Sequence, residues 1–301
     1  MSKRKNKNQL PVVLVILIVI IVSVVSVLNS QKDDGEPVNK VSTNGDSVVI
    51  HYLDVGQGDS EFIELPDGRC MLIDASTSEY SQTIINEIES FGYSTIDYVV
   101  ATHPHADHIG GMSKVIDAFD IGEIYMPKAS TTTKTFENLL TTISDKGLSV
   151  NTAKAGVEVY SDSTLEMEFL APVGSDYKDL NNYSAVLKIT YGSNSFLFMG
   201  DAEDVVEEEL LQRYYNSLEA DVLKVGHHGS SSSSTVDFLA AVNPQYAVIS
   251  CGVDNSYGHP HRETIKSLTD MGIEYYRTDK QGTITITCDG NGGFDIETEG
   301  K

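Results

Sequence analysis

Seven of the eight histidines in this chain lie in loops that follow short apolar segments. The segments cover residues 98–101, 222–225 and 247–250, and their composition is typical of buried strands. In α/β proteins, the loops that follow such strands meet at one edge of the sheet and build a binding site there. The fold is therefore constrained to one in which these three strand ends converge.

The rest of the sequence predicts an α/β domain of two sheets with helices outside. Apolar segments bounded by turn residues predict strands over residues 48–55, 61–65, 70–73, 96–101, 121–126, 164–170, 185–191, 195–199, 220–225, 246–250 and 283–288. Segments with apolar residues at helical spacing, such as Ile84, Ile85 and Ile88, predict helices over residues 81–91, 133–146, 203–216, 235–242 and 261–271.

The N-terminal residues predict a membrane anchor. Residues 1–9 form a basic tail, and residues 10–28 form an apolar segment of 19 residues that only Pro11, Ser23 and Ser26 interrupt. As a helix, this segment would span roughly 28 Å, which is close to the thickness of a bilayer core. The basic tail should remain in the cytoplasm, so we expect a single-pass protein whose other residues are extracytoplasmic. A cleaved signal peptide, which would give a secreted protein, is the alternative.

The composition of the remaining residues separates a linker from a globular domain, and the charge of the chain limits the kinds of substrate that we expect. Residues 29–46 are rich in Asn, Asp, Gly and Ser and are typical of a linker, whereas residues 47–298 have the pattern of one globular domain. The formal net charge of the chain is -23. Such an acidic surface repels phosphate backbones, so we expect no duplex DNA surface and favour a small-molecule or single-stranded nucleic-acid substrate. Three cysteines in apolar or β-branched runs predict buried free thiols: Cys70, Cys251 and Cys288.

The clearest chemistry lies in the loop after residue 101, which contains His103, Pro104, His105, Ala106, Asp107 and His108. Because side chains at i and i+2 of an extended segment point the same way, His103 and His105 can chelate one ion. Asp107 and His108 turn toward a second ion, and Asp201, at the end of another strand, can bridge two ions about 3.5–4 Å apart. Imidazole and carboxylate suit Zn²⁺, Mn²⁺ or Fe. We therefore predict two divalent transition-metal ions, Zn or Mn.

Three further residues are assigned roles by their positions. His227 follows a strand and lies 26 positions beyond Asp201, so we assign it to the second ion. Ions of this kind lower the pKa of a water toward neutral, so that hydroxide acts as the nucleophile, and Asp107 can orient it. His228 or His259 can donate a proton to the leaving oxygen. His259, on a loop flanked by Gly and Pro, can also bind substrate or an ion.

Several other polar residues have an ordinary structural explanation. The serines at 230–234 form either a linker that ends in a helix cap or a phosphate site at a helix N-terminus. Turn chemistry explains Asp54 and Asp59, which flank a Gly-rich turn. His51 and Lys224 fit plain strand positions.

The motifs resemble those of the metallo-β-lactamase superfamily, whose HxHxDH motif matches residues 103–108. More narrowly, the chain resembles the hydrolase domain of ComEC competence proteins and their stand-alone relatives. The resemblance runs in order from residue 47 to 298 and rests on residues 53–60, 101–111, 198–201, 223–230, 255–261 and 282–285. It implies a four-layer αββα sandwich, a dinuclear metal site and hydrolytic chemistry. It does not imply DNA uptake, because the polytopic channel part of ComEC is absent here.

One departure from the superfamily concerns the first ion. Many members place a further His on this ion, upstream of the bridging Asp, but no His lies between residues 108 and 227 here. Asn182 and Ser184 occupy that region, so either is a candidate third ligand. A site with fewer nitrogen ligands prefers harder ions such as Mn²⁺.

The resemblance implies a phosphodiesterase or nuclease. Two alternatives are a hydrolase of small extracellular esters, lactones or phosphocholine, and a non-catalytic accessory binding protein. The intact HxHxDH motif, Asp201 and His227 favour an enzyme, because a decayed site would lose ligands.

Overall fold

The computed structural model describes residues 46–300. The predicted basic tail and anchor lie outside the described residues, as does the predicted linker up to residue 45. Within residues 46–300, no helix combines the length and apolar character needed to cross a bilayer.

Eight strands form the first sheet. They are ordered β15 (Asp295–Thr298), β14 (Ile284–Cys288), β1 (Val48–Tyr52), β2 (Glu61–Glu64), β3 (Cys70–Ile73), β4 (Thr95–Val100), β5 (Asp120–Met126) and β6 (Val150–Thr152). Neighbours are antiparallel from β15 to β3 and parallel from β3 to β6. The parallel part therefore directs the carboxyl ends of β4, β5 and β6 to the same edge.

Seven strands form the second sheet. They are ordered β13 (Glu274–Arg277), β12 (Tyr246–Ile249), β11 (Val222–Lys224), β10 (Asn194–Phe198), β9 (Leu187–Tyr191), β8 (Leu165–Phe169) and β7 (Val157–Ser161). Neighbours are parallel from β10 to β13 and antiparallel from β7 to β10. The loops after β10, β11 and β12 therefore also leave from one edge.

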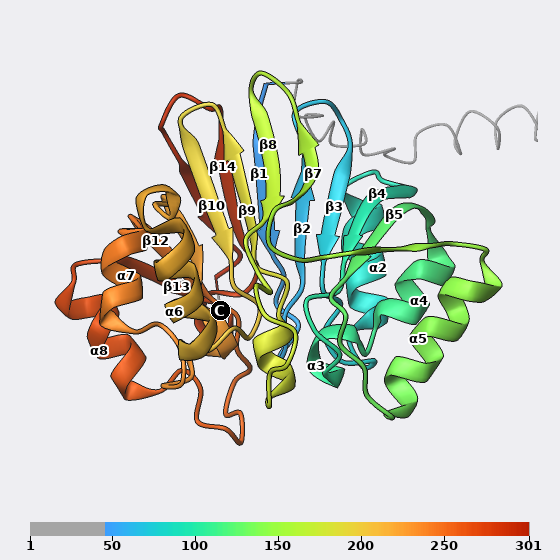
Figure 1. Ribbon diagram of the computed structural model, residues 1–301. Helices are drawn as coiled ribbons and strands as arrows, with labels where there is room; N and C mark the ends of the chain where they lie inside the picture. Colours follow the sequence, from blue (N-terminus) through green and yellow to red (C-terminus); the bar gives the residue numbers. More distant parts are fainter. Residues whose placement is uncertain (1–45, 301) are drawn as a thin grey trace, which may run out of the picture. The chain divides into compact units, whose positions relative to one another are not determined.

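Helices cover the outer faces of both sheets (Figure 1). The first sheet packs against α2 (Ser81–Ser90), α4 (Met112–Ala118) and α5 (Lys134–Asp145). The second packs against α6 (Asp204–Tyr214), α7 (Val236–Val242) and α8 (Arg262–Asp270). The short helices are α3 (Ala106–Ile109), α9 (Thr278–Gln281), η1 (Leu180–Tyr183), η2 (Tyr215–Ser217) and η3 (Gly226–Gly229).

The inner faces of the sheets share one apolar core. Side chains alternate along a strand, so Met71 and Ile73 of β3 face this core, whereas Cys70 and Leu72 face the helices. Tyr52 of β1 and Phe198 of β10 stack across the core, with ring centroids 6.1 Å apart. Each sheet is covered by the other sheet on one face and by helices on the opposite face. This explains why many strands are apolar on both faces.

The mixed α/β architecture with two sheets and helices outside is confirmed. The predicted buried thiols are also confirmed, because all three cysteines are free and buried. The sequence analysis missed α3, α4, β6, β7, β13 and β15. Of these, β7 and β15 are edge strands whose side chains are at most partly buried, so their apolar signal is weak.

Candidate metal centre

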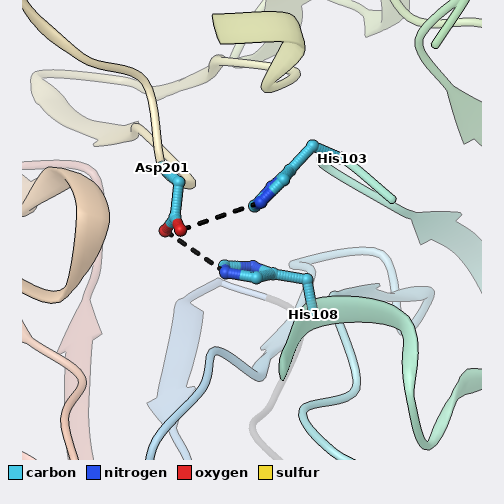
Figure 2. Close-up of side chains that lie close together, drawn as sticks. All are labelled: His103, His108 and Asp201. Carbon is cyan, nitrogen blue, oxygen red and sulfur yellow. Dashed lines mark ion pairs between the residues drawn. The ribbon is translucent and has the colours of Figure 1, made fainter. Parts of the chain in front are cut away.

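Two loops bring three buried side chains together. The Nε2 atom of His103 lies 3.7 Å from Oδ2 of Asp201, and Nε2 of His108 lies 3.2 Å from Oδ1 of the same carboxylate. Figure 2 shows both imidazoles pointing toward Asp201. His103 follows β4 and His108 stands on α3, whereas Asp201 follows β10 of the other sheet. The ligand atoms lie within 4.8 Å of one another, which is close enough for one metal ion to bind all three.

Asp201 also meets a second group of possible ligands. Asp107, His108 and His228 form this group. The Nε2 atom of His228 lies 3.4 Å from Oδ2 of Asp107 and 3.5 Å from Oδ1 of Asp201. We call the neighbourhood of His103 and His105 the first position, and that of Asp107, His108 and His228 the second position. The Asp201 carboxylate touches both.

His228, rather than the predicted ligand His227, belongs to the groups of described residues that could hold a metal ion. The Nε2 atom of His227 lies 3.7 Å from Oδ2 of Asp201, but its Nδ1 faces Oε1 of Glu203 at 3.3 Å. None of the possible metal groups within residues 46–300 includes it. Both histidines have left-handed backbones, with φ of 48° and 52°. Consecutive side chains therefore diverge from a tight turn, and sequence position does not tell which of the two is the better placed ligand.

The first position has fewer possible ligands. The Nε2 atom of His103 lies 3.0 Å from Nδ1 of His105. Asn182 is turned away, because its amide exchanges two hydrogen bonds with Glu203 at 3.2 and 3.1 Å. The Ser184 hydroxyl lies 3.4 Å from Nδ1 of His103, on the side opposite Asp201, and accepts a hydrogen bond from the Asp201 amide. Neither candidate third ligand therefore faces the first position.

A buried carboxylate supports the second position from behind. Oδ2 of Asp74, which is fully buried, lies 2.7 Å from Nδ1 of His108. The same carboxylate accepts hydrogen bonds from the Thr102 amide at 2.8 Å and the Thr102 hydroxyl at 2.5 Å. A carboxylate on the far nitrogen of a metal-binding imidazole fixes the ring orientation and raises its basicity.

A second buried carboxylate, Asp59, supports His228. Its Oδ1 atom lies 3.1 Å from Nδ1 of His228, and the same nitrogen lies 3.0 Å from the carbonyl oxygen of Ser250. Its other oxygen accepts a hydrogen bond from Nζ of Lys224 at 2.7 Å, and both partners are buried. Asp59 therefore supports His228 in addition to its place in the turn, as the family resemblance allowed, and Lys224 is not a plain strand residue. A Lys in an apolar strand signals such a pairing, because an unpaired buried charge is strongly destabilising.

Glycine lets the Asp59 turn approach the histidine loop. Gly58 has a φ of +151°, and a Cβ atom at this position would lie 2.4 Å from the carbonyl oxygen of Asp107. The same oxygen accepts a hydrogen bond from the Asp59 amide at 3.2 Å. The Gly-rich turn therefore packs directly against the backbone that carries Asp107.

Burial and charge set the protonation of the site. Burial opposes protonation of His228, but the carboxylates of Asp201 and Asp59 prevail and raise its pKa to about 10. Burial likewise opposes the charged form of His108, yet Asp201 and Asp74 raise its pKa well above the ordinary value. The opposite holds for His103, because burial and the nearby His108 lower its pKa. The second position thus attracts positive charge.

The residues present fit a bound cation. The Nε2 atoms of His108 and His228 and Oδ1 of Asp201 are buried and form no hydrogen bond with any described residue. Buried polar atoms without partners are rare, and these three meet at one point. Because imidazole must be neutral to bind a metal, ions in the second position would displace the protons that His108 and His228 otherwise hold.

The site opens into a cavity of 430 Å³. Four of its lining residues are histidines and none is Lys or Arg; the lining comprises Gln57, Pro104, His105, Ala106, Asp107, Thr133, Asn181, Asp201, His227, His228, Tyr257 and His259. Asn181 was missed in the sequence analysis, although it adjoins the candidate Asn182. Its Oδ1 atom is buried and has no hydrogen-bond partner among the described residues.

His259 lies on the cavity wall. Burial and then the nearby His228 and His227 lower its pKa to about 4, so the imidazole is neutral at neutral pH. Asn255 holds its backbone, accepting from the His259 amide at 2.9 Å and donating to the His259 carbonyl at 2.6 Å. Tyr257, which is 64% exposed, stacks on the His259 ring at 5.6 Å. A rigid neutral imidazole suits hydrogen bonding to substrate better than storage of a proton.

The remaining candidates lie away from the cavity. His51 bonds to Glu64 and Thr285 at 3.0 Å each, which agrees with a structural role. The serine run ends in a cap, because the Thr235 hydroxyl accepts a hydrogen bond from the Phe238 amide at 3.4 Å. The amides of Ser234 and Thr235 donate to Glu207 and are not free for phosphate.

Comparison with known proteins agrees with this geometry. Residues 53–253 match the model of the metallo-beta-lactamase superfamily. The ComE operon protein 3 of Bacillus subtilis (strain 168) is 31% identical over 252 residues, which cover 78% of this chain and 32% of that protein. The competence protein ComA of Neisseria gonorrhoeae is 31% identical over 246 residues, which cover 81% of this chain and 33% of that protein. The chain thus spans a third of the length of these relatives.

Among solved structures, the fold is similar to that of CmlA, a diiron beta-hydroxylase from Streptomyces venezuelae. The TM-score is 0.51 and the identity 15%, with 76% of this chain and 52% of that chain covered, so this likeness concerns the fold alone. The family model covers most of the described residues, and the histidines and aspartates it spans converge on one site. The chain therefore belongs to the metallo-beta-lactamase superfamily, a membership that implies a metal-dependent hydrolase.

Proposed function

We propose that the chain is a membrane-anchored, extracytoplasmic phosphodiesterase that cleaves single-stranded nucleic acid or small phosphodiesters. The observation that carries this proposal is the arrangement of the centre. Imidazoles and carboxylates from both sheets meet around Asp201, with three buried ligand atoms unpaired, at the floor of an open cavity of 430 Å³. The second position would be held by Asp107, His108, Asp201 and His228, and the first by His103, His105 and Asp201.

The chemistry of a phosphodiester suits two cations held in this way. Bound divalent ions activate a water and stabilise the charge that develops on the attacking and leaving oxygens. No Lys or Arg lines the cavity, so its own side chains provide no permanent positive charge for a phosphate. Asp107, whose pKa is lowered despite burial by a hydrogen bond to His228 and by the charge of His108, is ionised and able to orient a nucleophile.

Two uncharged groups on the cavity wall suit substrate positioning. The unpaired Oδ1 atom of Asn181 marks a side-chain amide available for a new partner, and the NH₂ group of that amide can donate to a phosphate oxygen. The Nδ1 atom of His259 is also buried and without a partner among the described residues. A neutral imidazole can donate one hydrogen bond, so His259 can contact the leaving oxygen without first acquiring a proton.

The rim of the cavity favours a single strand over a duplex. Tyr257 presents an exposed ring beside His259, and an exposed aromatic ring stacks with bases of any sequence. The net charge of -23 opposes a long duplex, whose phosphates would face an acidic surface along their whole length. A short or flexible strand brings few phosphates near that surface.

The proposed location rests on the sequence and on the relatives. Residues 10–28 are long and apolar enough for an anchor, and the basic residues precede them. One relative is named a competence protein. Protease added to intact cells should digest the domain, and full protection of residues 47–301 would contradict the extracytoplasmic location.

The experiment that tests the activity compares substrates on the full chain in detergent, loaded with Mn²⁺ or Zn²⁺. We expect turnover of bis-p-nitrophenyl phosphate and single-stranded oligonucleotides, weaker turnover of duplex DNA, and none with Asp201→Asn. Asp204→Asn, an exposed carboxylate in the first turn of α6, is the matched control. Turnover of nitrocefin, lactones, carboxylic esters or phosphocholine esters alone would favour the small-ester alternative, and bound metal without any turnover would favour the accessory protein.

A further inference from the structure

A second cavity, of 290 Å³, contains an unusual set of charges. Acidic residues outnumber basic ones by 44 to 21 in the sequence. This cavity nevertheless has three cations and no Asp or Glu in its lining, which consists of Lys128, Thr152, Ala153, Lys154, Ala155, Pro172, Val173, Gly174, Ser175, Tyr183 and Arg213. Its volume is close to the lower end of the roughly 300–1,000 Å³ that is usual for ligand pockets.

The three cations are available to a ligand. Lys128, Lys154 and Arg213 are exposed, and none forms an ion pair with another residue of the described range. The carboxylate nearest to Gly174, that of Glu209, accepts a hydrogen bond from the Tyr177 hydroxyl. Unpaired cations at the wall of one cavity in an acidic protein favour an anion.

Two segments of the chain each contribute residues to both cavities, although the cavities have no lining residue in common. Lys128 and Lys154 follow β5 and β6, which run parallel to β4 and end at the same edge as the strand that precedes His103. Thr133, five residues after Lys128, lines the cavity of the metal centre. The helix η1 provides the second link. Its residue Asn181 lines the metal cavity, and its residue Tyr183 lines the cationic cavity.

We propose that Lys128, Lys154 and Arg213 form a phosphate-binding subsite beside the active site. It holds a backbone phosphate of a single-stranded nucleic acid whose scissile bond lies at the metal centre. The inference rests on the proposed function. A phosphodiesterase needs positive side chains near its substrate, and the metal cavity itself has none in its lining. The hydroxyls of Thr152 and Ser175, which bond to no other described residue, can add donors.

The test measures binding apart from hydrolysis. Full-length protein stripped of metal is titrated into fluorescent single-stranded oligonucleotides, and anisotropy gives the Kd at several salt concentrations. The triple variant Lys128→Gln, Lys154→Gln, Arg213→Gln should bind about tenfold more weakly at low salt, and its salt slope should fall by about 0.7, which is the contribution of one phosphate contact on a single strand. The variant Lys128→Gln, Lys154→Arg, Arg213→Gln should recover part of both effects.

The matched control removes the same charge elsewhere. Lys114, Lys266 and Lys280 are exposed and line neither cavity, so the triple Gln variant of these lysines should bind as the wild type does. Equal weakening in both triple variants would overturn the subsite, because only net charge would then matter. Both variants should match the wild type in thermal unfolding.

Hydrolysis separates failure of the subsite from failure of the proposed function. For the subsite variant, the ratio of kcat/KM for an oligonucleotide to that for bis-p-nitrophenyl phosphate should fall about tenfold relative to the control. An unchanged ratio with active wild type would overturn the subsite and leave the phosphodiesterase intact. If wild type cleaves neither substrate, the proposed function fails whatever the binding result. If an abasic strand of equal length binds without dependence on the three cations, the phosphate assignment is overturned.

Discussion

The two candidate metal positions that share Asp201 are built very differently. In the second position, Asp107, His108 and His228 meet the carboxylate, and Asp74 and Asp59 stand behind the two imidazoles at 2.7 and 3.1 Å. In the first position, His103 and His105 face each other at 3.0 Å, and only hydroxyl groups lie behind His103. Buried carboxylates behind imidazoles orient them and raise their basicity. The second position should therefore bind its ion more tightly and fill first, whereas the first position should exchange its ion.

Loss of the shared ligand should have the largest effect. Asp201→Asn removes an anionic ligand from both positions, so we expect both ions to be lost and turnover to fall by roughly 10⁴-fold or more. Metal content by mass spectrometry and turnover of bis-p-nitrophenyl phosphate check this. Retention of one tightly held ion by Asp201→Asn would mean that the two positions are independent.

Substitutions of the neighbouring residues His227 and His228 should differ sharply in their effects on bound metal. His228→Ala should remove the second-position ion and lower turnover by roughly 10³-fold, because that imidazole is buried among the ligands. His227→Ala should keep the ion, since the other ring nitrogen of this side chain faces Glu203. Metal content of the two variants decides between them. Metal loss in His227→Ala alone would restore the assignment made from the sequence.

His259 should affect the rate without affecting either position. His259→Ala should keep its metal and lose about 10²-fold in turnover of an unactivated diester, because the hydrogen bond from its neutral imidazole to the leaving oxygen would be lost. The loss should shrink for p-nitrophenolate, a leaving group that needs little protonation. Metal loss equal to that of His228→Ala would make His259 a ligand.

The carboxylate behind His108 should have the smallest effect. Asp74→Asn should weaken the second-position ion about tenfold, because such supporting groups typically contribute 10–100-fold. Competition with a chelator measures this affinity, and the first position should change less. Asp221→Asn is a matched control, since this carboxylate also accepts backbone and hydroxyl hydrogen bonds, from Ser195 at 2.7 and 2.9 Å. Equal effects of both substitutions would mean that Asp74 acts only through general stability.

The sequence predicted the scaffold well because its strands are short, apolar and bounded by turns. It also identified the loop from His103 to His108, because the spacing of ligands within one loop is a local property. Both His227 and His228 line the cavity, and which of them belongs to the possible metal groups was not predictable, since the left-handed backbone at both depends on how the turn packs. Asn181 was missed for a similar reason: rotation along η1 decides which amide faces the cavity. Lys224 offered a usable signal, a charge within a buried strand.

The ion pair between Asp59 and Lys224 joins parts of the chain that belong to different sheets. Asp59 lies in the turn between β1 and β2, and Lys224 ends β11. Apolar contact between two sheet faces is non-directional, so by itself it specifies their mutual alignment weakly. In a slipped arrangement the ammonium would be buried without its carboxylate, at a cost of about 3–5 kcal/mol. The pair thus favours the one alignment of the two sheets that also places Asp59 behind His228.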